Sequence, residues 1–207
     1  MTSPTPSYGI CDQLRALVGA GKRYSCVLAD PPWAFETYSG NKVPQRAKKQ
    51  HYGTMTEAEL SALPVADVLA DDAWMQMWVL DTHVDQALRI GARWGFIYKS
   101  LGLIWHKMSP GGRAYVGLGH WYRSGGEISL LFTRGAPKRL DRGVRQFIDS
   151  PVREHSRKPE GQYERIERLV GGPRLELFAR QQRPGWDVAG NQVDKFKAIA
   201  SPMLEAQ

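Results

Sequence analysis

The sequence has few cysteines, no long apolar run and no secretory start, and each absence excludes a class of protein. Two cysteines are too few for a disulfide framework, and no pair of cysteines or histidines has the spacing of zinc ligands. No stretch of about 18 apolar residues is present, which excludes an ordinary membrane-spanning helix. Because the first residues have neither a cationic start nor an apolar segment, we expect a cytoplasmic or otherwise intracellular protein.

A dinucleotide-binding fingerprint is also missing, because no Gly-x-Gly-x-x-Gly stands in a suitable place. What the sequence does have is positive charge and enough apolar residues for a core. Its formal net charge of +7 suits a polyanionic partner such as nucleic acid, although many basic proteins bind none. The length of 207 residues predicts one compact domain, with a core over about residues 10–193.

Strand patterns and helix patterns alternate along the chain. Buried strands are expected at Tyr24–Ala29, Trp74–Leu80, Ser100–Trp105, Ile128–Thr133 and Leu175–Ala179. Helices are expected from a capping box at Thr56 and Glu59 through about Leu69, over His83–Trp94, and from Pro159 to Val170. The glycine-rich stretch 110–126 is expected to be a loop. The alternation predicts an α/β fold whose largely parallel sheet is covered on both faces and binds ligands at its carboxyl edge.

The tetrad Asp30-Pro31-Pro32-Trp33 directly follows the first expected strand. Two prolines fix φ and remove two backbone donors, so the turn is stiff and presents free carbonyl oxygens beside a carboxylate. These acceptors suit an NH2 group, and two of them holding an adenine amine would aim its lone pair at a methyl donor. Such positioning is worth roughly 7 to 11 kcal/mol. Trp33 and Tyr52 offer rings for base stacking. The alternative interpretation is a rigid turn with a packed indole.

Together with other blocks, the tetrad resembles a known family, the adenine-amino methyltransferases. The family includes the catalytic subunit of the eukaryotic messenger-RNA adenosine methyltransferase and many bacterial and phage DNA-modification enzymes. The resemblance runs from about Ile10 to Val193, and its blocks agree in order and spacing. Besides the tetrad, the matching blocks are Asp12, His51–Met55, Gly119–Trp121, Glu127, Ser156–Pro159, Glu176–Arg180 and Gly190–Gln192.

The resemblance implies a Rossmann-like class I methyltransferase that moves a methyl group from S-adenosylmethionine to the 6-amino nitrogen of adenine. It implies a permuted order, in which the catalytic block precedes the strand that bears much of the cofactor site. Asp30 would contact the methionine amine of the donor and the target amine, and the Pro31 carbonyl would help to hold that target. Lys158 would pair with the carboxylate of the donor. Tyr52 would line the acceptor loop.

The remaining cofactor contacts are also implied by the resemblance. Asp12, with the backbone around Gln13, would meet the adenine of the donor. The ribose would be bound by Arg180, Asn191 and Gln192. Gln182-Arg183 stands where the eukaryotic enzyme has a His-Asn pair, and Gln182 can still hydrogen-bond a hydroxyl.

Two basic stretches bear on the identity of the acceptor. The first is suited to phosphates beside a base in the pocket, or is a solvated loop; it consists of Lys42, Arg46, Lys48, Lys49 and His51. The second either tracks a nucleic-acid backbone or is an exposed connection; it consists of Arg134, Lys138, Arg139, Arg142 and Arg145.

The preferred hypothesis is methylation of adenine in DNA, with RNA as the nearest alternative. A duplex target has to be flipped out of the stack, and a second copy of a chain this small would help to grip the duplex, so a homodimer is plausible. Two rivals remain open: a catalytically silent nucleic-acid-binding subunit, and an enzyme that methylates a free nucleoside or a small amine.

Overall fold

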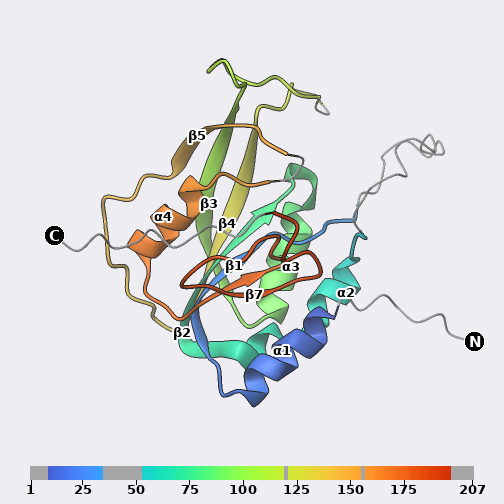
Figure 1. The fold of residues 1–207 in the computed structure, drawn as a ribbon, viewed down its shortest axis with the longest axis vertical. Coiled ribbons are helices and arrows are strands. Elements are labelled where there is room, and N and C mark those ends of the chain that lie inside the picture. The colour runs from blue at the N-terminus through green and yellow to red at the C-terminus, as the bar shows by residue number, and fades with distance from the viewer. Residues whose placement is uncertain (1–8, 35–52, 119–120, 155–156, 197–207) are drawn as a thin grey trace, which may run out of the picture.

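The computed structural model describes residues 9–34, 53–118, 121–154 and 157–196 as a seven-stranded sheet with helices on both faces (Figure 1). The helices are α1 (Ile10–Gly19), α2 (Glu57–Ser61), α3 (Val84–Arg93) and α4 (Gly161–Leu169), with short 3-10 turns at Val65–Val68 and Asp81–His83. The strands are β1 (Tyr24–Ala29), β2 (Leu69–Val79), β3 (Ile97–Met108), β4 (Gly126–Arg134), β5 (Phe147–Pro151), β6 (Arg174–Leu177) and β7 (Asp187–Ala189).

The sheet has the order β5-β3-β4-β2-β1-β6-β7. β4 runs antiparallel to both of its neighbours, whereas the other neighbouring strands are parallel. The predicted α/β fold with a largely parallel sheet is therefore confirmed. β1 ends at Ala29 beside Leu177 at the end of β6. We call this side of the sheet the carboxyl edge, and Asp30 lies on it.

The two faces of the sheet are covered by different helices. Val27 of β1 belongs to an apolar cluster with Leu14 of α1 and Ile90 of α3, whereas Leu28 belongs to a second cluster with Ile166 of α4. Each of these side chains is almost fully buried, which stabilises the fold by roughly 1.5 to 3 kcal/mol per side chain. Burial on both faces explains why β1 is continuously apolar.

The helix predicted from the capping box begins as expected but is much shorter. Thr56 and Glu59 make both reciprocal hydrogen bonds, yet α2 ends at Ser61. Pro64 has no backbone N–H and disfavours helical geometry at the residue before it, so the prediction of a helix to Leu69 is wrong. Leu69 instead begins β2. None of the helices in the described ranges is long and apolar enough to cross a membrane.

The backbone turns sharply where β6 ends, at Leu177, two residues before the predicted strand end at Ala179. Phe178 adopts a φ of 62°, which is uncommon outside glycine and ends the strand at Leu177. The next residue, Ala179, donates its N–H to the Ala189 carbonyl of β7 at 3.2 Å. Gly190 lies so close to this turn that a Cβ would stand 2.9 Å from both the nitrogen and the oxygen of Ala179.

Gly190→Ala should therefore destabilise the protein by about 1 to 3 kcal/mol, because the new methyl group meets backbone atoms that cannot rotate away. Gly171→Ala is the control, since nothing lies within 4 Å of its Cβ position; its effect should stay within about 0.5 kcal/mol. Urea denaturation of the two variants measures both values. Equal stability of the two variants would contradict this packing argument.

Candidate active site

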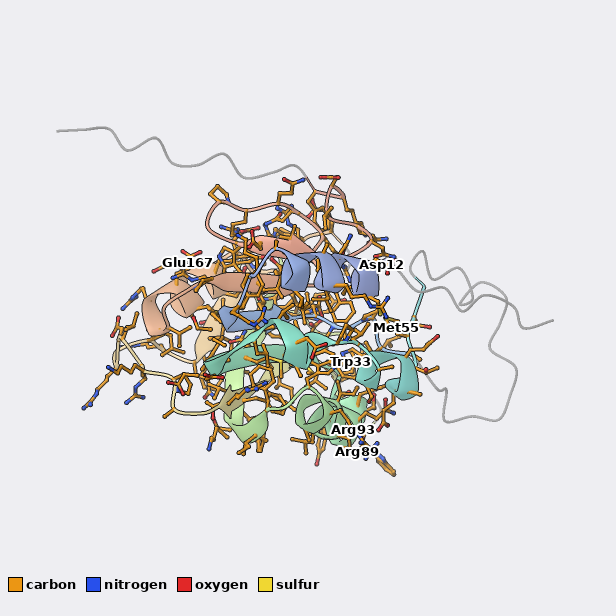
Figure 2. The ribbon with its side chains drawn as sticks, turned by 90° about the horizontal axis from the view of Figure 1, so that it is seen from below. Asp12, Trp33, Met55, Arg89, Arg93 and Glu167 are labelled. Atoms are coloured by element: carbon orange, nitrogen blue, oxygen red, sulfur yellow. The ribbon has the colours of Figure 1, made fainter. Side chains whose placement is uncertain are left out.

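Trp33 anchors the turn that carries Asp30. Its side chain is only 6% exposed, and its indole N–H donates to the carbonyl of Trp78 on β2 at 3.2 Å. The ring also packs against His83, with 5.6 Å between the ring centroids. Figure 2 shows Trp33 and Met55 on the side of the molecule opposite Glu167 of α4. Because so little of the indole is exposed, little of its face is available for stacking with a base. Its contacts with Trp78 and His83 instead hold the turn rigid.

The carbonyl oxygens of the tetrad are not free, contrary to the sequence prediction. The Pro31 oxygen accepts the N–H of Trp33 at 2.9 Å, and the Pro32 oxygen accepts the N–H of Met55 at 2.8 Å. These bonds arise because the turn closes on itself and then pairs with residue 55. A carbonyl oxygen has two lone pairs, so each still has capacity for one further donor.

Asp30 is held by a buried ammonium group from a distant part of the chain. Lys158 Nζ donates to both carboxylate oxygens of Asp30, at 2.8 and 2.9 Å. The same nitrogen lies 3.2 Å from a carboxylate oxygen of Glu127, whose other oxygen lies 2.6 Å from Lys107 Nζ. We call Lys107, Glu127, Lys158 and Asp30 the charge row. Signs alternate along it, so each buried charge has an opposite neighbour.

The charge row controls the protonation of its own members. Burial alone would lower the pKa of Lys158, but the carboxylates of Asp30 and Glu127 outweigh it and raise that pKa. Burial would likewise raise the pKa of Glu127, but Lys158 and Lys107 outweigh it and lower that pKa. Both groups are therefore charged near neutral pH.

Two adjoining hollows meet at Asp30. The first is lined by Lys158, Tyr163 and Glu176 among others, and the second by Pro32, Gly190, Asn191 and Gln192. Phe178 and Arg180 line both hollows, as Asp30 does. The structure thus brings together six of the predicted site residues, namely Asp30, Pro32, Lys158, Arg180, Asn191 and Gln192.

The two predicted residues of α1 lie less directly in these hollows. The Asp12 side chain is 80% exposed and pairs with Arg15 at 3.2 Å (Figure 2). Both ends of the Gln13 side-chain amide are hydrogen-bonded to one residue, because the amide donates to the Gly190 carbonyl at 3.2 Å and accepts the Gly190 N–H at 2.8 Å. Gln13 therefore ties α1 to the backbone of the second hollow.

Other predicted residues lie elsewhere or outside the described ranges. Gln182 donates to Asp194 at 2.9 Å and lines a separate shallow hollow beside α1. Arg134, the first residue of the second basic stretch, pairs with Ala73 near the start of β2, at the edge opposite Asp30. The other residues of that stretch are exposed in the connection between β4 and β5, namely Lys138, Arg139, Arg142 and Arg145. The predictions for the first basic stretch and for Tyr52 fall outside the described residues and concern Lys42, Arg46, Lys48, Lys49, His51 and Tyr52.

Sequence reasoning assigned no role to Lys107, Glu127 and Glu176, which the structure places at the site. Glu176 is 8% exposed in β6, and its described hydrogen bonds come from the Tyr163 hydroxyl, 3.1 Å from each carboxylate oxygen. Burial, reinforced by the charge of Asp30 and opposed by that hydrogen bond, raises the pKa of Glu176 to about 8. A charged residue between Leu175 and Leu177 in a buried strand was the available signal.

Ionisation of Glu176 should make stability fall with pH. Its pKa is near 4.5 when unfolded and about 8 when folded, so between these values the unfolded chain has lost a proton that the folded chain keeps. As the pH rises through this window, the free energy of unfolding of Glu176→Gln should increase relative to that of the wild type by up to about 1.4 kcal/mol per pH unit. Denaturant titrations at pH 5, 6.5 and 8 measure the gain, with exposed Glu164→Gln as control. A pH-independent difference would be the contrary result.

Known proteins match this chain over nearly its whole length. The MT-A70 family model matches residues 24–192. The METTL3 subunit of N(6)-adenosine-methyltransferase from Danio rerio is 33% identical over 196 residues, which are 91% of this chain and 31% of that protein. The human METTL3 catalytic subunit is 33% identical over 91% of this chain and 32% of its own length. The type II methyltransferase M.MunI from Mycoplasma sp is 29% identical over 195 residues, 85% of this chain and 80% of its own.

The chain thus spans about a third of the METTL3 proteins but most of M.MunI. The matched region contains β1, the tetrad, the charge row and the strand end at Phe178. The resemblance that was drawn from the motif blocks is confirmed, and the chain belongs to the MT-A70 family of methyltransferases.

Proposed function

We propose that this protein transfers a methyl group from S-adenosylmethionine to the 6-amino nitrogen of adenine in DNA. The observation that carries the proposal is the Asp30 carboxylate at the junction of two hollows, held on one side by Lys158 and on the other by the Trp33 anchor. A donor whose amino-acid end lies at Lys158 in the first hollow and whose ribose lies in the second has to pass Asp30. Asp30 is therefore placed to hold an acceptor amine beside the methyl group.

The residues present fit the polar groups of the donor. Its amino-acid end carries an ammonium and a carboxylate, and the Asp30–Lys158 pair offers one opposite charge to each. Arg180, Asn191 and Gln192 line the second hollow and supply hydrogen-bonding groups for ribose hydroxyls. Gly190 lets this wall pack directly against the backbone of Ala179, because its Cα carries no side chain. When bound, S-adenosylmethionine supplies an electrophilic methyl group on a sulfonium.

Asp30 and the Pro31 carbonyl are the acceptors for the target amine. The Pro31 oxygen uses one lone pair on Trp33 and keeps the other for an N–H of the substrate. Two acceptors that hold both amine hydrogens draw the nitrogen away from planarity, and its lone pair is then directed at the methyl carbon. The nitrogen would form its bond to the methyl carbon as the bond from that carbon to the sulfonium sulfur breaks, with the electron pair left on sulfur. The nitrogen would also lose one proton, for which Asp30 is the adjacent base.

DNA is favoured over RNA by the extent of the alignments. The chain aligns with 80% of M.MunI, but with only 31–32% of the METTL3 proteins, whose names specify adenosine. The net charge of +7 supports a polyanionic acceptor in either case.

Methyl transfer to matched oligonucleotides tests the proposal. The purified chain, labelled S-adenosylmethionine and single-stranded DNA, duplex DNA or RNA of one sequence should yield N6-methyldeoxyadenosine in DNA after digestion to nucleosides. Asp30→Asn keeps the shape of the side chain but removes its charge, and it should lose at least about 100-fold in rate because the amine is no longer positioned.

Each contrary outcome identifies a different rival. Labelling of RNA alone would overturn the DNA assignment. Labelling of free adenosine as readily as of polymers would favour a small-molecule enzyme. Donor binding without transfer to any acceptor would favour a silent nucleic-acid-binding subunit, and full activity of Asp30→Asn would refute the mechanism.

A further inference from the structure

The hairpin between β3 and β4 projects beyond the carboxyl edge (Figure 1, top). Several of its aromatic side chains are exposed. Trp121 is 93% exposed and Tyr122 is 90% exposed, while Leu118 is 85% exposed. The hairpin backbone is hydrogen-bonded, since Tyr115 donates its N–H to the Lys107 carbonyl at 2.9 Å. We call residues 109–118 and 121–125 the hairpin tip.

Exposure of this kind is exceptional in the molecule. The chain has seven tryptophans, and the other six are at most 7% exposed. Contiguous exposed apolar side chains mark a binding surface more often than a solvated one. The tip therefore has the properties of a surface that a ligand or partner covers on binding.

The charge of the tip indicates what covers it. Arg113 and Arg123 are exposed, and neither side chain has an ion-pair partner among the residues that the structure describes. No aspartate or glutamate occurs between residues 109 and 126. Aromatic rings interleaved with unpaired arginines suit a ligand that has both ring faces and anionic groups, which is nucleic acid. Contact between two such tips in a symmetric pair would set arginine against arginine.

The position of the tip connects it to Asp30. β4 begins at Gly126, and its second residue, Glu127, is part of the charge row that ends on Asp30. β3 reaches the same edge through Lys107, another member of that row. The tip thus projects from the side of the sheet at which the target amine is held.

We propose that the hairpin tip binds unpaired nucleotides beside the target adenine, with bases stacked on Trp121 and Tyr122 and phosphates on Arg113 and Arg123. This inference rests on the proposed function. Unpaired strands fit better than closed duplex, because the faces of paired bases are already covered by their neighbours.

Fluorescence quenching tests the contact without measuring activity. Since the other tryptophans are buried, acrylamide should quench mainly Trp121. A single-stranded oligonucleotide should protect it, whereas a closed duplex of the same sequence and the base-free polyanion heparin should protect it much less. Equal protection by heparin would show that the tip binds polyanions by charge alone, and it would overturn the stacking of bases. Protection that grows with protein concentration alone, with a doubled mass in sedimentation, would instead make the tip an interface between two copies.

Substitutions test the role of the ring. Trp121→Ala should raise KM for a single-stranded oligonucleotide roughly 5- to 150-fold, with kcat and donor affinity unchanged. Trp121→Phe keeps an aromatic ring, so its KM should lie close to that of the wild type. Because Trp121 is exposed, unchanged melting temperatures are expected and serve as the folding control. Unchanged KM in Trp121→Ala would overturn the inference while leaving methyl transfer intact, whereas absence of transfer with normal protection would overturn only the proposed function.

Discussion

Lys158 supplies one ammonium group to two carboxylates, Asp30 and Glu127, in a place where its side chain is only 9% exposed. The contact joins three segments that are remote in sequence: the turn after β1, the start of β4 and the loop before α4. Removing one partner of a buried pair leaves an uncompensated charge and commonly costs about 3 to 5 kcal/mol. The edge of the sheet is thus stabilised by the same charges that the proposed donor would meet.

Rigid backbone features surround this charge row. Trp33 is buried behind Asp30, Phe178 turns the chain at the end of β6, and Gly190 allows two backbone segments to approach within van der Waals contact. If the Asp30 carboxylate were mobile, its proximity to the reactants would accelerate methyl transfer little, because the rate advantage of positioning depends on a defined geometry. Burial of Trp33 would therefore contribute to the proposed function although its ring offers little surface to a base.

Much of this arrangement could be predicted from the sequence, because continuous apolar runs identify buried strands and Asp30-Pro31-Pro32-Trp33 ends one of them. Helix α1 was missed because no side-chain cap marks its start, and β5 and β7 because they are only five and three residues long. The hydrogen bond on the Pro32 carbonyl comes from residue 55, a tertiary contact that no local pattern reveals, whereas the one on the Pro31 carbonyl comes from Trp33 within the turn. The roles of Glu127 and Glu176 likewise depend on strand neighbours, although a glutamate within the apolar run of β6 was a visible sign.

The proposed function requires the Asp30–Lys158 pair to bind the amino-acid end of the methyl donor. Calorimetric titration of S-adenosylmethionine into the wild type and into Lys158→Met tests it most directly, with circular dichroism and melting curves to confirm that the variant folds. The folded variant should bind the donor at least about 10-fold more weakly, because a charge-assisted hydrogen bond is lost. Equal affinity of the two proteins would contradict it.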